Sequence, residues 1–299
     1  MSVDRLDAAG VPWRKRARRA WMGVQTALGR PRGFFSPYRY AASVAPPAGY
    51  PALASPFARA FAASAKGAAG QGLAAPADVA AAIQTRRRAL LALGGPAPRP
   101  RWGQSWYPGL DGAAAYAIVG ASQPSRMIEV GSGHSTRFMA QALADAGRDD
   151  CAITCIDPAP RAALQGLGVR WERRLLTVDD VALFAGLEPG DVAFFDSSHL
   201  LWPGSDVDII LNGILPALAP GVLVHFHDVV LPDAYPQNWA WRGYTEQLAL
   251  SGWIAGGGAR ILWSSHYARH HAGWAEEGVL AEIPRDPAAP ETALWLIRA

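Results

Sequence analysis

The pattern of apolar positions changes near residue 125. Before that point, apolar residues recur at helical spacing over 78–93 and 111–121, and strand-like runs are scarce. After it, short continuous apolar runs alternate with amphipathic segments. Because such runs indicate strands covered on both faces, they predict an α/β fold with a doubly wound, mostly parallel sheet. The chain is expected to divide into a helical or irregular N-terminal extension, residues 1–100, and a main domain, residues 101–299.

The expected elements of the main domain follow from the same periodicity. Strands are predicted over 127–130, 152–156, 169–175, 192–195, 222–226, 253–264 and 293–297. Helices are predicted over 135–146, 161–167, 206–218 and 237–250. In such a sheet the carboxyl ends of the parallel strands meet at one edge, which is where ligands bind.

Composition narrows the class of protein. Half of the residues are hydrophobic and the net charge is only +3, which does not indicate a nucleic-acid binder. Cys151 and Cys155 lie four apart along the extended segment that contains the strand predicted over 152–156, and they cannot bridge each other. Without a cysteine framework or a run of 18 apolar residues, a cytoplasmic protein with no transmembrane segment is expected.

A basic cluster stands out in the N-terminal extension. Arg14, Lys15, Arg16, Arg18 and Arg19 lie among Trp13 and Trp21 at helical spacing. This pattern is typical of a solvated surface helix and also of a helix that contacts an anionic membrane, and the sequence leaves both open. The aromatic segment 33–40 is expected to pack on the main domain, and 46–51 reads as a linker.

A glycine loop follows the first predicted strand. Gly131 and Gly133 lie in Glu129-Val-Gly-Ser-Gly-His-Ser-Thr136, where glycine lets the backbone approach a nucleotide-like ligand. Thr136 stands where a dinucleotide-binding loop has its third glycine. Glu129 precedes the first glycine by two residues, and Asp157 ends the next strand, where a carboxylate can accept both ribose hydroxyls. These two acids favour S-adenosylmethionine over NAD.

Polar side chains also follow two later strands. Asp196 and His199 end one, and His225, His227 and Asp228 end the next. One interpretation is a general base that removes a hydroxyl proton, with His199 as first choice and His227 as second, beside Asp196.

The other interpretations keep the same residues. Asp196, His227 and Asp228 could bind a divalent metal, Mg²⁺ through carboxylates or Mn²⁺ with an imidazole, or the polar groups could simply cap strand ends. Strand alternation places His225 and His227 on one face and Asp228 on the other, so at most two of the three are expected to share the site.

Further aromatic and histidine residues lie downstream. An apolar wall for an acceptor is one interpretation of Tyr235, Trp239, Trp241 and Trp202, and packing of their own loop is the other. His266, His270 and His271 are expected to be surface or packing residues, because no H-E-x-x-H glutamate lies between the first two.

Four blocks together resemble a known family. They are the loop Ile128–Phe138, Phe195-Asp-Ser-Ser-His199, the run Ile214–Asp228, and the ending Ala293–Arg298. The combination resembles class I S-adenosylmethionine-dependent methyltransferases of the bacterial family-24 type. The resemblance implies a seven-stranded sheet of order 3-2-1-4-5-7-6.

The same resemblance implies the donor-binding residues. It implies binding by Glu129, Gly131, Ser132, Gly133 and Asp157, with adenine near Asp180 and with Asp196 at the donor's edge.

The sequence therefore predicts methyl transfer from S-adenosylmethionine to an oxygen of a small molecule, such as a sugar or a secondary metabolite. The alternatives are a metal-dependent or NAD-dependent enzyme on the same fold, or a non-catalytic relative. A homo-oligomer is left open.

Overall fold

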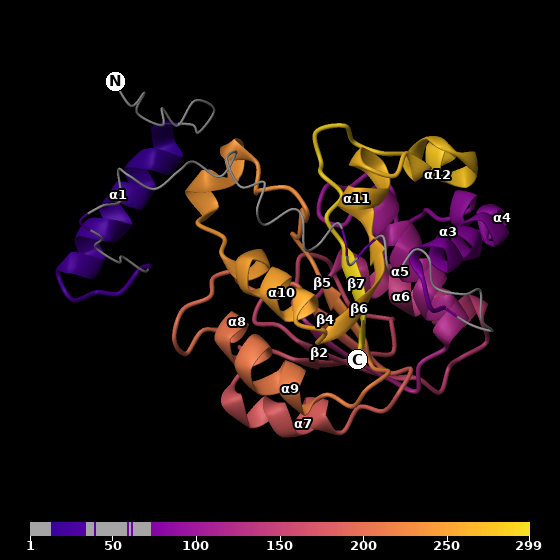
Figure 1. Cartoon of the computed structure of the whole chain (residues 1–299), viewed down its shortest axis with the longest axis horizontal. Helices are drawn as coiled ribbons and strands as arrows, with labels where there is room; N and C mark the ends of the chain where they lie inside the picture. Colours follow the sequence, from indigo (N-terminus) through magenta and orange to yellow (C-terminus); the bar gives the residue numbers. More distant parts are fainter. Residues whose placement is uncertain (1–12, 34–38, 40–58, 60, 62–72) are drawn as a thin grey trace.

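A seven-stranded sheet lies at the centre of the computed structural model, which describes residues 13–33, 39, 59, 61 and 73–299 (Figure 1). The strand order β3-β2-β1-β4-β5-β7-β6 confirms the predicted one. Six strands run in one direction, and β7, which lies between β5 and β6, is antiparallel to both. The strands are β1 (Arg126–Val130), β2 (Ala152–Ile156), β3 (Arg170–Glu172), β4 (Val192–Phe195), β5 (Leu223–Phe226), β6 (Ala259–Ser264) and β7 (Leu294–Arg298).

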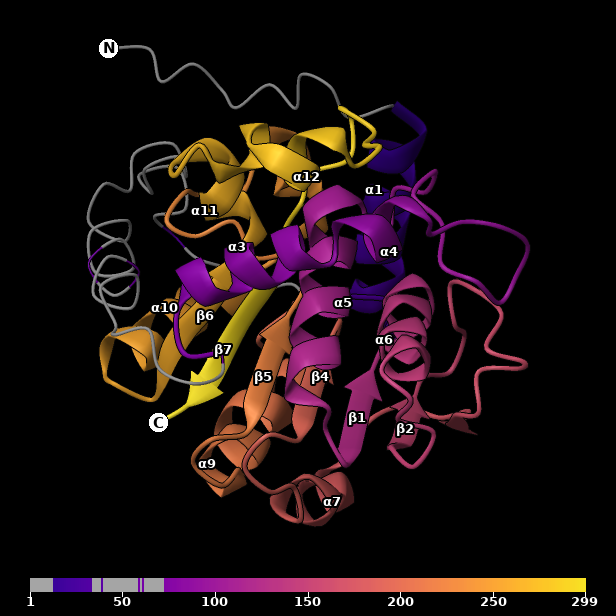
Figure 2. The same ribbon diagram turned by 90° about the vertical axis from the view of Figure 1, so that its right-hand side faces the viewer.

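Helices cover both faces of the sheet (Figures 1 and 2). One face carries α3 (Pro76–Thr85), α4 (Arg87–Leu91), α5 (Gly109–Ser122) and α6 (His134–Asp145). The other carries α7 (Val181–Ala185), α8 (Asp206–Asp208), η4 (Ile209–Ile214), α9 (Leu215–Ala217) and α10 (Glu246–Ala255). The remaining helical segments are α1 (Trp13–Ala27), η3 (Val178–Asp180), η5 (Gln237–Arg242), α11 (Ser265–His270), η6 (Trp274–Glu276) and α12 (Gly278–Glu282).

Alternation along the strands builds one core on each face. Met127 packs into the core beneath α5 and α6, and Ile128 packs into the core beneath α7 and α10. The register places Glu129, Phe194, His225 and Trp295 side by side across four strands. Two residues further along, Gly131, Asp196 and His227 therefore lie together at the carboxyl edge of the parallel strands.

Three predicted elements are wrong in part. Residues 161–167 are not helical, because Arg137 donates to the carbonyl of Ala163 and Gly166 adopts a φ of +84°. The helix predicted over 237–250 is interrupted at Gly243, whose φ is +70°. The strand predicted from 253 begins at Ala259, because α10 continues to Ala255.

The N-terminal extension contributes to the core and to the surface. Val79, Ile83 and Leu90 are fully buried in the same core as α5, so the division at residue 100 stays a prediction. The basic segment forms α1, as predicted, with no buried residue. Residues 34–38 and 40–58, which hold most of the aromatic segment and the predicted linker, lie outside the described residues.

The surface helix α1 contacts one part of the main domain. Arg19 donates to the carbonyl of Trp241 at 3.0 Å, and the ammonium of Lys15 lies 4.3 Å from the centre of the Trp241 ring. Among the described helices, none is long and apolar enough to cross a membrane. Contact of α1 with a membrane surface stays a prediction.

Candidate active site

The loop after β1 is held between two other segments. Gly131 and Gly133 have φ angles of +76° and +151°, which residues with a Cβ rarely adopt. A Cβ on Gly131 would overlap the carbonyl oxygen of Asp196 at the end of β4. A Cβ on Gly133 would lie 3.0 Å from the backbone nitrogen of Ala162. The fold itself therefore requires both glycines, and the loop packs directly on the second polar cluster.

Glu129 lies beneath this loop and is fully buried. Ser135 Oγ donates to its Oε1 at 2.5 Å, and Thr136 Oγ1 donates to its Oε2 at 2.6 Å. Burial raises the pKa of Glu129 to about 7, although these hydroxyl hydrogen bonds oppose the rise. Thr136 stands where a dinucleotide-binding loop has its third glycine, and its hydroxyl and that of Ser135 bind Glu129 to the loop. Direct contact of Glu129 with the donor stays a prediction.

Asp157 and Asp180 are both engaged within the protein. Asp157 Oδ2 accepts from the backbone nitrogen and the hydroxyl of Ser132 at 2.6 and 3.1 Å, so it ties the end of β2 to the glycine loop. A carboxylate has about four acceptor positions, so Asp157 can also accept from a ligand. Asp180 is paired with Arg174 at 2.6 Å and accepts from the backbone nitrogen of Thr177. The predicted donor contacts of both acids stay predictions.

The first residue of α6 adds a group that the sequence analysis did not single out. The His134 side chain is buried, and its Nδ1 has no hydrogen-bond partner among the described residues. Burial lowers the pKa of His134 to about 4, so the ring is neutral at pH 7. His134 follows Gly133 at a helix N-terminus, where backbone N–H groups are available to ligands. An unpartnered buried nitrogen at this point fits a polar ligand such as the predicted donor.

His199 lies among three carboxylates at the end of β4. Its Nδ1 is 2.9 Å from Glu246 Oε2, and its Nε2 is 3.2 Å from Asp196 Oδ1 and 3.5 Å from Asp228 Oδ2. Because each ring nitrogen faces a carboxylate, the imidazolium form is stabilised. Burial favours the neutral ring, but the hydrogen bonds to Asp196 and Glu246 prevail and raise the pKa of His199 to about 10.

His227 takes a matching position at the end of β5. Its Nε2 is 3.4 Å from Asp111 Oδ2, and its Nδ1 is 3.6 Å from Asp196 Oδ1. Burial opposes protonation, but the charge of Asp196 and the contact with Asp111 raise the pKa of His227 well above its ordinary value.

Asp196 is shared by both imidazoles. Burial would raise its pKa, but the charges of His227 and His199 and their hydrogen bonds hold the pKa of this carboxyl far below its ordinary range. Its side chain is 39% exposed, against 13% for Asp228 and 1% for Glu246. Asp196 is therefore the ionised carboxylate of the cluster that a ligand reaches most easily.

Asp228 reaches the cluster through a left-handed backbone. Its φ is +53°, so the alternation of side chains along β5 stops before it. Its Oδ1 lies 3.8 Å from His227 Nδ1, and its Oδ2 accepts from Arg242 at 3.1 Å. His225 faces the core instead, with its ring stacked on Phe194 at 3.7 Å. At most two of the three polar residues share the site, as predicted, but the alternation argument misplaces Asp228.

The cluster as a whole is rich in carboxylates. Its acids are Asp111, Asp196, Asp228 and Glu246, and its cationic groups are His199, His227 and Arg242. Such a site can hold a hydroxyl, a cationic ligand or a metal ion. The three predicted metal ligands, Asp196, His227 and Asp228, do lie together, and binding of an ion there stays a prediction.

Aromatic rings border this cluster. Tyr235 and Trp239 stack with centroids 6.1 Å apart, and Tyr244 contacts both rings edge-on. The Tyr244 ring lies 4.5 Å from that of His199, and the Arg242 guanidinium lies 4.1 Å from the Trp239 ring. This arrangement suits an apolar wall next to the charged groups, which is the role predicted for Tyr235 and Trp239.

Four members of the site were not predicted, namely Asp111, Arg242, Glu246 and Tyr244. Asp111 lies in the first turn of α5 and accepts from the backbone nitrogens of Thr292 and Ala293. An acid in the otherwise apolar run Gly109–Ala115 was the signal that could have revealed it, since a buried carboxylate needs partners. Glu246 carries no such signal in the sequence, because its contact with His199 depends on α10 beginning at this residue.

A separate group of titratable side chains lies on the loop after β5 and on α11. Asp233 Oδ2 is 2.6 Å from His266 Nε2 and 2.8 Å from His271 Nε2. Within the described part of the chain, this is the one trio whose metal-ligand atoms all lie within 4.8 Å of one another. The surface-or-packing interpretation of these histidines missed their common partner, which lies more than thirty residues earlier.

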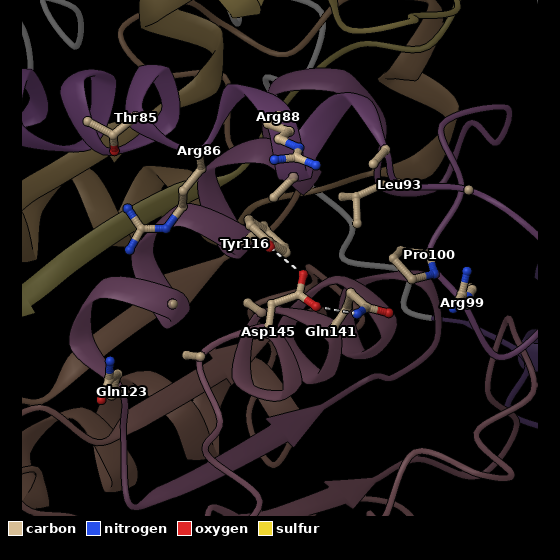
Figure 3. Close-up of a pocket in the computed structure, with 16 residues that line it drawn as sticks. Thr85, Arg86, Arg88, Leu93, Arg99, Pro100, Tyr116, Gln123, Gln141 and Asp145 are labelled. Atoms are coloured by element: carbon tan, nitrogen blue, oxygen red, sulfur yellow. Dashed lines mark hydrogen bonds between the residues drawn. The ribbon is translucent and has the colours of Figure 1, made fainter.

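A cavity of about 790 Å³ lies elsewhere, between α4, α5 and α6 (Figure 3). Arg86, Arg88 and Arg99 line it, and Tyr116 donates to Asp145 within it. It contains none of the predicted site residues, so it is distinct from the edge of the sheet where the glycine loop and the charged cluster meet.

The fold and the loop define the class: the chain carries a class I, S-adenosylmethionine-dependent methyltransferase domain. Residues 128–229 match the model of methyltransferase family 24, described as a methyltransferase domain, which confirms the resemblance seen in the sequence. The match begins within β1 and ends just after Asp228, so it spans both the glycine loop and the charged cluster.

Similar solved structures include proteins from three bacteria. A Klebsiella pneumoniae protein provisionally assigned as an O-methyltransferase is 18% identical, with 55% of this chain and 74% of that one covered and a TM-score of 0.33. A provisionally assigned methyltransferase from Thermobifida fusca YX is 15% identical, with 74% and 92% covered and a TM-score of 0.37. A Streptomyces achromogenes O-methyltransferase involved in tomaymycin synthesis, solved with S-adenosylmethionine, is 21% identical, with 58% and 77% covered and a TM-score of 0.33. No curated protein matches the chain.

Proposed function

We propose that this methyltransferase acts on an oxygen atom of a small molecule. The observation that supports this most is the packing of Gly131 on the carbonyl of Asp196. It puts the donor loop and the charged cluster next to each other at one edge of the sheet, where doubly wound folds bind their ligands.

The donor side would be formed by the glycine loop and its surroundings. The backbone of Gly131, Ser132 and Gly133 lines the approach, and Asp157 offers acceptor positions for ribose hydroxyls. The neutral His134 ring supplies a further polar contact. Glu129 keeps the loop in shape through Ser135 and Thr136. When bound, S-adenosylmethionine supplies an electrophilic methyl group.

On the acceptor side, Asp196 would accept the hydrogen bond of the substrate hydroxyl, take its proton as the oxygen is methylated, and release that proton to water from its partly exposed carboxylate. His199 and His227 keep this carboxylate ionised and fix its orientation. A general-base role for His199 requires the neutral ring, which the pairing with Asp196 and Glu246 opposes below about pH 10. We therefore assign the hydroxyl contact to Asp196 and positioning to the two imidazoles, and the precise alignment that results supplies much of the rate.

A divalent cation on Asp196, His227 and Asp228 is the second candidate. It is favoured by one observation, the convergence of two carboxylates on His227 Nδ1 at 3.6 and 3.8 Å. An ion there would take the place of the proton on His227 Nδ1 as the positive charge between the two carboxylates. Mg²⁺ and Mn²⁺ are the expected metals. Turnover that disappears with a chelator and returns with Mg²⁺ or Mn²⁺ would favour this alternative.

The decisive experiment combines calorimetry with turnover. We expect the wild-type protein to bind S-adenosylmethionine and S-adenosylhomocysteine but not NADH. Asp196→Asn should retain donor affinity and lose methyl transfer to a panel of hydroxylated small molecules by about 100-fold or more. Asp150→Asn, at an exposed carboxylate that pairs with Arg148 and contacts no site residue described above, is the control. No donor binding at millimolar concentration, or full turnover in Asp196→Asn, would contradict the proposal.

A further inference from the structure

We propose that Asp233, His266 and His271 form a zinc site that fastens the loop after β5 to α11. This site is independent of the charged cluster around Asp196. It shares no residue with that cluster, and its ligands come from a loop and a helix that the methyltransferase motifs do not include.

The first argument is the geometry of the three ligand atoms. Both imidazoles direct the same atom, Nε2, at a single carboxylate oxygen, Asp233 Oδ2, at 2.6 and 2.8 Å. The three atoms all lie within 4.8 Å of one another. Ligands of a tetrahedral ion about 2.0 Å from each atom are spaced about 3.3 Å apart, so a small outward shift of each side chain would admit the ion.

The second argument is the chemistry of the donor set. Two imidazoles and one carboxylate leave one position of a tetrahedral ion open for water, and zinc is commonly held in this way. Imidazole nitrogen disfavours Mg²⁺ and Ca²⁺, which prefer oxygen ligands. The His271 side chain is 33% exposed and that of Asp233 is 48% exposed, so an ion can enter from solvent.

The third argument is that the surroundings hold the ligands in place. Ser264 Oγ accepts from the backbone nitrogen of Tyr267 at the start of α11, and the Tyr267 ring stacks on His271. On the loop side, Gln247 accepts from the backbone nitrogen of Val230 and donates to the carbonyl of Asp233. A site prepared in this way loses little conformational entropy when the ion binds.

The consequence is a fixed position for the loop that carries Tyr235 and Trp239. Along the chain, Asp233 lies between Asp228 of the charged cluster and these two rings. An ion at Asp233 would therefore hold the aromatic border of the cluster against α11.

The test is a calorimetric titration of the full chain, without a histidine tag, with Zn²⁺. We expect one equivalent to bind, and Co²⁺ in its place to give the visible absorption of a protein-bound ion. His266→Gln, His271→Gln and Asp233→Asn should each weaken Zn²⁺ binding by about tenfold or more. His270→Gln is the matched control, because His270 lies on the same helix beside His266 but outside the trio.

Two further measurements keep the proposal falsifiable if a variant folds poorly. Zn²⁺ should raise the melting temperature of the wild-type protein, since a ligand that binds only the folded state stabilises it. Asp228→Asn should bind Zn²⁺ like the wild type. Absence of Zn²⁺ binding by the wild-type protein would overturn the proposal. So would loss of binding in Asp228→Asn with retention in His266→Gln and His271→Gln, because the ion would then lie in the charged cluster.

Discussion

Beneath the glycine loop, burial shifts the pKa of titratable groups toward their neutral forms, whereas in the cluster around Asp196 ion pairing favours the charged forms. Burial raises the pKa of Glu129 to about 7 and lowers that of His134 to about 4. Around Asp196, burial acts in the same directions, but charge pairing prevails and raises the pKa of His199 to about 10. The two regions touch at Gly131 and Asp196.

The difference lies in the partners that each group receives. Glu129 is bound by two hydroxyls, which stabilise a carboxylate less than a full charge does. His199 is bound by carboxylates on both ring nitrogens. Desolvation is therefore decisive for the groups beneath the glycine loop, and ion pairing is decisive for those around Asp196. A neutral pocket suits a ligand that is recognised by hydrogen bonds, and a charged one suits chemistry in which a proton leaves.

The largest effect is expected from a substitution that disrupts the contact between the two regions. Gly131→Ala would place a methyl group on the carbonyl of Asp196. We expect donor binding to be lost and the free energy of unfolding to fall by about 3 kcal/mol or more, because both the left-handed φ and the overlap must be accommodated. Urea unfolding and calorimetry with S-adenosylhomocysteine measure the two effects.

Gly147→Ala separates the two causes. Gly147 has a similar φ of +68°, but nothing lies within 4 Å of the position of its Cβ. This variant should lose only about 1 kcal/mol of stability and bind the donor normally. If Gly131→Ala behaved like Gly147→Ala, the close contact would not be what joins the two regions.

The same comparison shows what sequence patterns can predict. β1, β2 and β4 lie within one residue of their predicted bounds, because buried parallel strands are uninterrupted apolar runs between polar ends. Asp196, His199, His227 and Asp228 were found because they follow such strands. Asp111 and Glu246 were not, since only the packing of α5 and α10 brings them to the two histidines.

Local backbone geometry accounts for other differences. Asp228 escaped the alternation rule because its φ of +53° turns the side chain toward His227. Residues 161–167 have a helical composition, but Arg137 and the glycine at 166 stabilise a turn. Neither a single left-handed residue nor a distant arginine leaves a periodic signal in the sequence.

The second prediction concerns the pH dependence of the acceptor side. The pKa of His199 is raised from 6.5 in the unfolded chain to about 10 in the fold. Its pairing with Asp196 and Glu246 therefore stabilises the protein fully below about pH 6.5, and this contribution is lost as pH rises through 10. We expect His199→Gln to be less stable than the wild type at pH 6, with a difference that narrows toward pH 10.

Chemical unfolding of both proteins from pH 6 to 10 measures this narrowing, and His270→Gln, at an exposed ring, serves as the control. A constant difference across that range would mean that His199 is not held as an imidazolium. A turnover profile that rises toward pH 10 in the wild type but not in His199→Gln would assign the base role to His199 instead of Asp196.

The smallest expected effect concerns Glu129, because its pKa moves less far from its ordinary value than that of His199. Burial raises it from 4.5 to about 7, so the wild-type protein loses stability as pH rises from about 4.5 through 7, when the buried carboxyl must ionise. Glu129→Gln cannot ionise, so its stability should fall less between pH 5 and 8, while Ser135 and Thr136 still find a polar partner. Urea unfolding of both proteins at pH 5 and pH 8 measures the fall in the free energy of unfolding. An equal fall in the wild type and in Glu129→Gln would contradict the raised pKa of Glu129, on which the contrast with Asp196 depends.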